Sequence, residues 1–230
     1  MCLGISVVVM AFNEAATLDA VVREIVLTLD GLGRQYEVII VDDGSTDDTG
    51  LISEHLRNEF TKIRVIHHPA NEGLGGVYRT GFAQAQSDLI TFFPADGQFP
   101  APMIRQFASL MDSADMVLGY LPHRDCSLLA RSLSKAEKLL YRLLFGDLPE
   151  FQGILMFRRG LLNEFELKSS GRGWTVLMEL IIRTCRSGHR IVNLPIEVQP
   201  RMNGKSKVNN LATILDNLRQ VFLLRRSLDS

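Results

Sequence analysis

Short apolar runs alternate with helix-like segments along the first half of the chain, and this alternation constrains the fold most. The runs are rich in β-branched and aromatic residues and are bounded by turn residues, which is typical of strands. They cover Ile5–Met10, Glu37–Val41, Arg64–His67, Leu89–Phe93 and Met116–Gly119. Strands that are joined through helices form right-handed crossovers and a mostly parallel sheet. The sequence therefore predicts an α/β fold whose ligands bind beyond the carboxyl ends of the strands.

The alternation changes after about residue 121. We expect helices over 127–145, 174–186 and 210–226, with short strands over 154–157 and 191–198. No low-complexity linker and no internal repeat divides the chain. At this length, one α/β domain is the expected organisation. We predict a single domain over 1–230 with two functional halves, 1–121 and 122–230.

Composition excludes several classes of protein. The formal net charge of -1 gives no indication of a nucleic-acid partner. The three cysteines, Cys2, Cys126 and Cys185, are far apart and lack the paired spacing of a disulfide framework or a zinc site, which fits a reducing compartment. No secretory signal is evident at the N-terminus, and no window is long and apolar enough to span a membrane. We therefore expect a cytoplasmic protein that meets a membrane only at its surface.

Acidic residues follow two of the predicted strands. Asp42 and Asp43 come directly after the second strand, and buried carboxylates there need hydrogen bonds or a ligand. Asp47, a few residues later, has the alternative role of capping the next helix. Asp96 follows the fourth strand, and with Gln98 it offers the oxygen ligands that a hard divalent cation prefers.

Glycines mark the loop after the third strand. Gly73 and Gly75 stand at a predicted helix start, where glycine lets the backbone approach a ligand and the helix N-terminus favours anions. The first strand instead leads into Met10–Glu14, which contains no glycine. A dinucleotide-binding fold requires a glycine-rich turn at this place, so that class is disfavoured. The adjacent His67 and His68 face opposite ways on a strand and are interpreted as structural rather than as a metal pair.

Four segments in this order resemble family 2 glycosyltransferases of the GT-A fold. They are Val9–Glu14, Ile40–Ser45, Asn71–Gly75 and Ala95–Gln98. More narrowly, the chain resembles the dolichol-phosphate mannose synthase and polyprenyl-phosphate glycosyltransferase group. The resemblance implies an inverting enzyme that moves a sugar from a nucleotide diphosphate to a polyprenyl phosphate with Mg²⁺ or Mn²⁺. It also implies a nucleotide-sugar-binding half over 1–121, an acceptor-side half with amphipathic helices over 122–230, and a place on the cytoplasmic face of a membrane, with room for a membrane-anchoring partner.

The resemblance assigns roles in the first half of the chain. It places Phe12 and Glu14 near the nucleotide, and Asp42 or Asp43 on the base or the ribose. Gly73 and Gly75 belong to its substrate-binding loop. Asp96 and Gln98 match two metal-ligating positions, with Asp96 also counted as catalytic. The first aspartate of the family's metal motif is replaced by Pro94 in this chain, and proline cannot ligate a metal.

Further roles fall in the second half. Arg201, Lys205 and Lys207 match a basic family loop that closes over phosphates, where Arg201 and Lys207 stabilise the leaving group and Lys205 contacts substrate. The alternative for this loop is a solvated basic turn. Gln152 lies in a stretch, 151–159, that is similar to the group's acceptor-side segment. Glu179 matches a recurring carboxylate of the family, with an ordinary helix residue as the alternative.

Two helices bear on the membrane. The helix over about 124–145 combines a leucine stripe with Arg131, Lys135, Lys138 and Arg142, and the terminal helix over 210–226 has a similar pattern. Basic amphipathic helices lie in membrane interfaces, although most leucine stripes pack into a core. The family resemblance favours the membrane surface.

Two other functions stay open at this stage. The acceptor could be a saccharide or protein hydroxyl, which needs a carboxylate base, and Glu179 is the candidate for that base. Alternatively, the chain is a non-catalytic nucleotide-sugar-binding module, which Pro94 supports.

Overall fold

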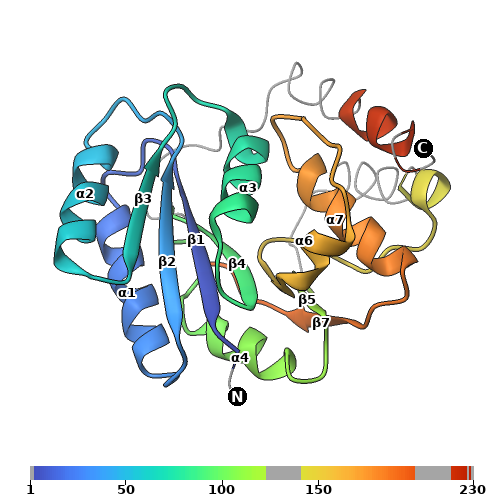
Figure 1. The fold of residues 1–230 in the computed structure, drawn as a ribbon, viewed down its shortest axis with the longest axis horizontal. Helices are drawn as coiled ribbons and strands as arrows, with labels where there is room; N and C mark the ends of the chain where they lie inside the picture. The colour runs from blue at the N-terminus through green and yellow to red at the C-terminus, as the bar shows by residue number, and fades with distance from the viewer. Residues whose placement is uncertain (1–2, 123–140, 200–218, 227, 229–230) are drawn as a thin grey trace.

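A computed structural model describes residues 3–122, 141–199, 219–226 and 228 of the chain. Its seven-stranded sheet has the order β3-β2-β1-β4-β6-β5-β7 (Figure 1). The strands are β1 (Ile5–Ala11), β2 (Tyr36–Asp42), β3 (Ile63–His67), β4 (Leu89–Pro94), β5 (Met116–Tyr120), β6 (Leu155–Arg158) and β7 (Ile191–Pro195). Only β6 is antiparallel to its neighbours, β4 and β5, within the ladders of this sheet. The predicted α/β fold with a mostly parallel sheet is confirmed.

Helices cover both faces of the sheet. They are α1 (Leu18–Asp30), α2 (Thr49–Glu59), α3 (Gly73–Gln84), α4 (Met103–Leu110), α6 (Gly160–Glu164) and α7 (Thr175–Arg186). The short α6 was not predicted. Residues 141–145 and 219–226 are also helical, whereas the remainder of the predicted helices over 127–145 and 210–226 lies outside the described residues. In the part of the chain that is described, no helix has the length and apolar character needed to span a membrane.

Alternate residues of β1 pack into two separate apolar layers. Val7 and Val9 join the cluster that contains α1 and α4, whereas Val8 joins the cluster that contains α3 and α7. Because the strand is buried on both faces, it reads as a continuous apolar run rather than as an alternating one. The same arrangement brings the ends of β2, β1 and β4 to neighbouring positions on one edge of the sheet (Figure 1).

The α3 helix begins at Gly73, where the sequence predicted a helix start. Glycine has a low helix propensity, and a carboxylate described below holds this first turn. The β7 strand ends at Pro195 rather than at Val198. Proline has no backbone N–H, so it cannot donate to the sheet ladder.

Candidate functional site

Three buried carboxylates lie at the carboxyl edge of the sheet. Asp42 and Asp43 follow β2, and Asp96 follows β4, with β1 between these two strands. Their exposed fractions are 5%, 3% and 5%, respectively. An ionised carboxylate with so little access to water needs hydrogen bonds, a counter-charge or a cation. The partners of each carboxylate therefore indicate what it does.

Asp42 is paired with a histidine of the neighbouring strand. Its Oδ2 lies 2.9 Å from His67 Nδ1, and its Oδ1 accepts a hydrogen bond of 3.0 Å from the Ser45 amide. The hydrogen bond to Asp42 raises the pKa of His67 above its ordinary value, although burial alone would lower it. The other ring nitrogen of His67 lies 3.0 Å from Glu54 Oε1. Asp42 thus belongs to a charged row that runs from β2 across β3 to α2.

Asp43 faces the opposite side of the sheet and organises the loop before α3. Its carboxylate lies 2.7 Å from His68 Nδ1 and accepts 2.9 Å hydrogen bonds from Asn71 Nδ2 and from the amides of Glu72 and Gly73. Amides at a helix N-terminus favour an anion, and here the anion belongs to the chain itself. This explains why α3 begins at Gly73.

The two histidines follow the expected geometry. Asp42 and His67 are register partners on β2 and β3, so they share one face, and the next residue of each pair shares the other face. Each histidine consequently meets its own aspartate, which agrees with the structural interpretation of His67 and His68. The sequence offered a signal for this arrangement, since two adjacent acids and two adjacent histidines end neighbouring strands.

The loop after β1 is tied to the loop after β2. The amide of Asn13 donates to Ser45 Oγ at 2.9 Å, and Asn13 Oδ1 accepts from the Thr46 amide at 2.8 Å. The Glu14 amide donates to Thr49 Oγ1 at 2.8 Å. Asn13 has a φ of 54°, a conformation that asparagine adopts more readily than most residues. The sequence reasoning missed Asn13, which fixes the backbone between the predicted nucleotide contacts Phe12 and Glu14.

Asp47 contacts the start of α2, although the N-cap residue of that helix is Asp48 rather than Asp47. Its Oδ1 accepts a 3.0 Å hydrogen bond from the amide of Thr49, the first residue of α2, and its Oδ2 accepts from the Ala15 amide. Burial would raise the pKa of Asp47, but these hydrogen bonds hold it below the ordinary value. Asp47 therefore helps to frame the edge by joining the first two loops.

The loop after β4 places Asp96 and Gln98 at the same edge. Asp96 Oδ1 accepts a 3.1 Å hydrogen bond from the Gln98 amide, across Gly97 with a φ of 73°. The backbone carbonyl of Gln98 accepts a 2.8 Å hydrogen bond from Gln199. Pro94, where the resemblance expects an aspartate, is the last residue of β4 and stands opposite Met10 of β1.

These residues fit a hard divalent cation that is completed by its substrate. Asp96 offers a carboxylate and Gln98 an amide oxygen, both of which Mg²⁺ accepts. No group of three or more histidine, cysteine, aspartate or glutamate side chains suited to a metal occurs within the described ranges. Magnesium is commonly held by one or two carboxylates with substrate phosphates and water supplying the other ligands.

Gln152 lies at this edge because β6 runs against its neighbours. The residues before an antiparallel strand lie beside the residues that follow the parallel ones. The Gln152 amide donates to the Gly119 carbonyl at 2.8 Å. The next residue, Gly153, has a φ of 106°, and a Cβ there would come within 2.8 Å of the Phe99 ring. The predicted acceptor-side residue Gln152 is thus close to the loop that carries Asp96 and Gln98.

Gly73 and Gly75 admit a segment of the chain. The Gly75 amide donates to the Arg172 carbonyl at 2.8 Å. A Cβ at Gly75 would lie 1.9 Å from the Gly171 carbonyl oxygen, and one at Gly73 would lie 2.6 Å from the Arg172 oxygen. These glycines allow a close backbone approach, whereas the sequence predicted the approach of a ligand, and substrate binding by them stays a prediction. What approaches in the structure is the backbone of residues 171–173.

Glu179 lies away from this edge cluster, inside α7. Its side chain is 0% exposed and accepts hydrogen bonds from the amides of Lys168 and Ser169, at 3.0 and 2.7 Å, and from Arg183 at 2.9 Å. Burial raises the pKa of Glu179, but these hydrogen bonds outweigh it, so the pKa lies below its ordinary value. Arg201, Lys205 and Lys207 lie outside the described residues. Gln199, two residues before Arg201, is bonded to Gln98.

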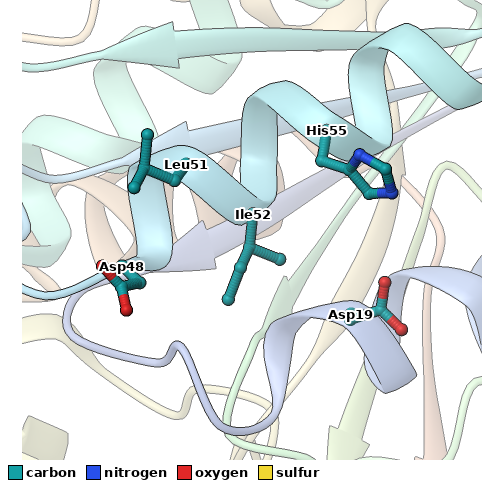
Figure 2. Close-up of a pocket in the computed structure, with 5 residues that line it drawn as sticks. All are labelled: Asp19, Asp48, Leu51, Ile52 and His55. Atoms are coloured by element: carbon teal, nitrogen blue, oxygen red, sulfur yellow. The ribbon is translucent and has the colours of Figure 1, made fainter.

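A shallow groove between α1 and α2 contains none of the predicted site residues. Figure 2 shows the side chains that line it, of which one comes from α1. They are Asp19, Asp48, Leu51, Ile52 and His55. Asp19 is paired with Arg23 at 2.9 Å, as expected for an i,i+4 ion pair on a helix surface. We therefore locate the candidate site at the strand edge and not in this groove.

The order of the sheet and the acidic loops beside β1 define a GT-A fold. Residues 6–165 match Glycosyl transferase family 2, which is more than half of the chain. The chain therefore belongs to this family. Both the family and the fold agree with the resemblance found in the sequence.

Relatives of known name share modest identity with the chain. Glycosyltransferase AglD of Haloferax volcanii is 29% identical over 92% of this chain and 35% of its own length. Dolichol-phosphate mannosyltransferase of Pyrococcus furiosus is 25% identical over 96% of this chain and 64% of its own length. Undecaprenyl-phosphate mannosyltransferase of Micrococcus luteus is 27% identical over 76% of each protein. The chain thus spans about a third of the first relative and less than two thirds of the second.

A solved structure shares the fold. Glucosyl-3-phosphoglycerate synthase of Mycobacterium tuberculosis, in complex with Mn²⁺, UDP and glucosyl-3-phosphoglycerate, superposes with a TM-score of 0.70. It is 22% identical, and the match covers 96% of this chain and 80% of that one. This likeness establishes the architecture.

Proposed function

We propose that the chain transfers a sugar from a nucleoside diphosphate to a polyprenyl phosphate at a membrane surface, with Mg²⁺ or Mn²⁺. The observation that carries the proposal is the position of Asp96 and Gln98 at the carboxyl end of β4, beside the joined loops that follow β1 and β2. Two relatives bear the names of polyprenyl-phosphate mannosyltransferases, which supports the acceptor. The M. tuberculosis synthase was solved with UDP and Mn²⁺, which supports the donor and the cation.

In this proposal, different loops at the edge contact different parts of the donor. Phe12 and Glu14 contact the nucleoside, and Asp42 or Asp43 reads its base or ribose. Asp96 and Gln98 hold the cation and, through it, the diphosphate. When bound, the cation neutralises charge on the departing diphosphate. Arg201 and Lys207 stabilise the same charge, as the sequence predicts.

The surroundings of Glu179 support a phosphate acceptor over a hydroxyl one. A general base needs to reach the acceptor's proton with a pKa near the working pH. The carboxylate of Glu179 is fully buried, accepts a hydrogen bond from the backbone amide of Ser169, and has a pKa below its ordinary value. A phosphate monoester is largely dianionic at neutral pH, with a second pKa of about 6, and needs little help from a base. Attack from the face opposite the leaving group inverts the anomeric configuration.

Exposed apolar side chains support a membrane surface. Phe222 and Leu223, in the helix over 219–226, are 52% and 45% exposed, and Leu143, in the helical segment 141–145, is 76% exposed. Arg142 and Arg219 lie on the same two helical segments. Apolar side chains beside cationic ones are typical of helices that lie in a membrane interface. We place the protein on the cytoplasmic face, where its separated cysteines stay reduced, with room for a membrane-anchoring partner.

A transfer assay tests the proposal. Purified protein is incubated with Mn²⁺, labelled UDP- or GDP-sugars, and either extracted polyprenyl phosphate or a panel of saccharides. We expect label in the lipid fraction, lost on chelation of the metal. Label on a saccharide would assign a hydroxyl acceptor instead. Binding of nucleotide without transfer to either acceptor would identify a non-catalytic module, the alternative that Pro94 supports.

A further inference from the structure

Residues 168–173, here named the strap, join the two halves of the molecule. The strap lies between α6 and α7 in sequence, and it contacts α3 of the first half. Each of its ends is held by a charged side chain.

Glu179 anchors the start of the strap. Its carboxylate accepts hydrogen bonds from the amides of Lys168 and Ser169, and Arg183 supplies the counter-charge at 2.8 Å. Two consecutive backbone amides that share one buried carboxylate fix the direction in which the chain continues. The carboxylate that the sequence offered as a candidate base therefore acts on the backbone of the strap.

The middle of the strap packs against α3 at Gly75 and Arg79. Arg79 Nη1 donates to the Gly171 carbonyl at 3.1 Å, and the Gly75 amide donates to the Arg172 carbonyl at 2.8 Å. A side chain on Gly75 would collide with the Gly171 oxygen at 1.9 Å. Position 75 therefore requires glycine so that α3 can pack against residue 171, whether or not a ligand is bound.

The tip of the strap reaches the donor edge through Asn71. Arg172 Nη2 donates to the backbone oxygen and to Oδ1 of Asn71, at 2.7 and 2.8 Å. Asn71 Nδ2 donates in turn to Asp43 at 2.9 Å. The asparagine amide is thus oriented by a cation on one side and an anion on the other. Charge-assisted hydrogen bonds are the stronger ones, so this contact defines the loop that precedes α3.

We propose that Arg172 and Glu179 are positioning residues for the donor site, acting through Asn71 on the loop that Asp43 holds. The proposal rests on the proposed function, in which the donor binds at this edge. The strap belongs to the acceptor-side half, so its fit on α3 links the shape of the donor site to that half. If the donor binds only when this loop is ordered, the strap contacts that order the loop raise the affinity for the donor without touching it.

Arg172→Ala tests the proposal with little risk to the fold. Arg172 is exposed, so loss of its side chain should leave the melting temperature within ~2 °C of the wild type. The backbone bond to Gly75 remains. We expect binding of UDP or GDP with Mn²⁺, measured by calorimetry, to weaken about tenfold or more. Arg172→Lys should recover part of the affinity, because its ammonium keeps the charge and can donate to the two Asn71 oxygens that the single atom Nη2 of Arg172 bonds.

Hydrogen exchange supplies a readout that needs no ligand. The amides of Glu72, Gly73 and Gly75 should exchange faster in Arg172→Ala than in the wild type, because the loop opens locally. Arg186→Ala, which removes an exposed arginine at the far end of α7, serves as the matched control and should change neither exchange nor affinity.

A double-mutant cycle tests the common path. Glu179→Gln and Arg172→Ala should each weaken donor binding, and their combination should cost less than the sum, because both act on the same loop. If Glu179→Gln fails to fold, donor affinity and amide exchange in the Ala and Lys variants of Arg172 still test the proposal. Unchanged affinity and unchanged exchange in Arg172→Ala would overturn the proposal and leave the proposed function standing. A wild-type protein that binds no nucleotide would overturn both.

Discussion

Asp96 and Glu179 are both buried carboxylates, but their surroundings differ in kind. Asp96 is 5% exposed and stands in a loop at the open edge of the sheet, two residues from the amide of Gln98. Glu179 is 0% exposed and stands within α7, where two strap amides and Arg183 bind it. Burial of an acid is therefore weak evidence for chemistry. The partners of the acid, and the edge on which it stands, distinguish a ligand-binding role from a structural one.

The largest effect should come from Asp96. Asp96→Asn keeps the shape of the side chain but removes the charge that, in the proposed function, holds a cation on the diphosphate. We expect transfer to fall about 1000-fold or more, with little change in melting temperature. Steady-state assays with Mn²⁺ present provide the measurement. Turnover like that of the wild type would refute the metal assignment.

Arg201 should come next, with an effect on turnover rather than on donor affinity. If it contacts the diphosphate mainly as charge builds there, Arg201→Ala lowers kcat by roughly 100-fold. The KM for the donor should change much less, since contacts made only in the transition state do not set ground-state affinity. Arg201→Lys should recover part of the loss. A pure rise in KM would show that Arg201 binds the donor only.

Glu179 should affect stability more than the pH dependence of transfer. Glu179→Gln leaves Arg183 without its buried counter-charge, which should lower the free energy of unfolding by about 3 kcal/mol. The pKa of Glu179 is lowered in the folded state, so the ionised carboxylate stabilises the fold. This contribution to the free energy of unfolding is fully present above the unfolded-state pKa and is lost as the pH falls through the folded-state pKa. The stability gap between wild type and variant should therefore narrow in acid, as denaturant titrations at several pH values can measure.

The same variant separates the positioning role from a catalytic one. A positioning residue leaves the pH–rate profile of the remaining activity unchanged, whereas loss of a general base removes its acidic limb. Loss of that limb in Glu179→Gln would contradict the comparison with Asp96.

Pro94→Asp should sharpen the comparison by adding a second carboxylate beside Asp96. We expect the affinity for Mn²⁺ without nucleotide to rise about tenfold, because the loop then offers another hard oxygen ligand. Electron paramagnetic resonance of free Mn²⁺ measures this directly. No change in affinity would mean that position 94 does not face the cation.

The smallest effect concerns the membrane surface. Phe222→Ser with Leu223→Ser should weaken binding to vesicles that contain anionic lipid about tenfold, since each buried apolar side chain contributes roughly 1–2 kcal/mol. Leu27→Ser with Leu51→Ser is the matched control, because these leucines of α1 and α2 are 73% exposed. High salt should release part of the bound protein, because each basic residue near an anionic surface contributes on the order of 1 kcal/mol to membrane binding. Equal loss in both pairs would refute a specific membrane face.

The sequence predicted the sheet because its strands are buried on both faces and their apolar runs are unmistakable. It also placed Asp42, Asp43 and Asp96 at one edge, since parallel strands end together. It could not predict that Asp43 would serve the α3 turn, because that depends on the register of β2 and β3 and on the path of the next loop.

The strap was beyond prediction because its contacts span a long separation in sequence. Arg172 and Asn71 are 101 residues apart, and nothing in the local pattern of either residue indicates the other. Glu179 was recognised as a carboxylate of interest, but its partners are backbone amides, which carry no residue signature. Local periodicity thus fixes the elements of this fold, whereas the roles of its acids follow from tertiary contacts.

Calorimetric titration of UDP and GDP into wild type and Asp96→Asn, with and without Mn²⁺, tests most directly whether the donor and its cation meet at the β4 edge. One nucleotide should bind the wild type at least tenfold more tightly with Mn²⁺ than without it. In Asp96→Asn, Mn²⁺ should no longer make this difference. Equal, Mn²⁺-enhanced affinity in both proteins would place the donor's cation elsewhere and contradict the account.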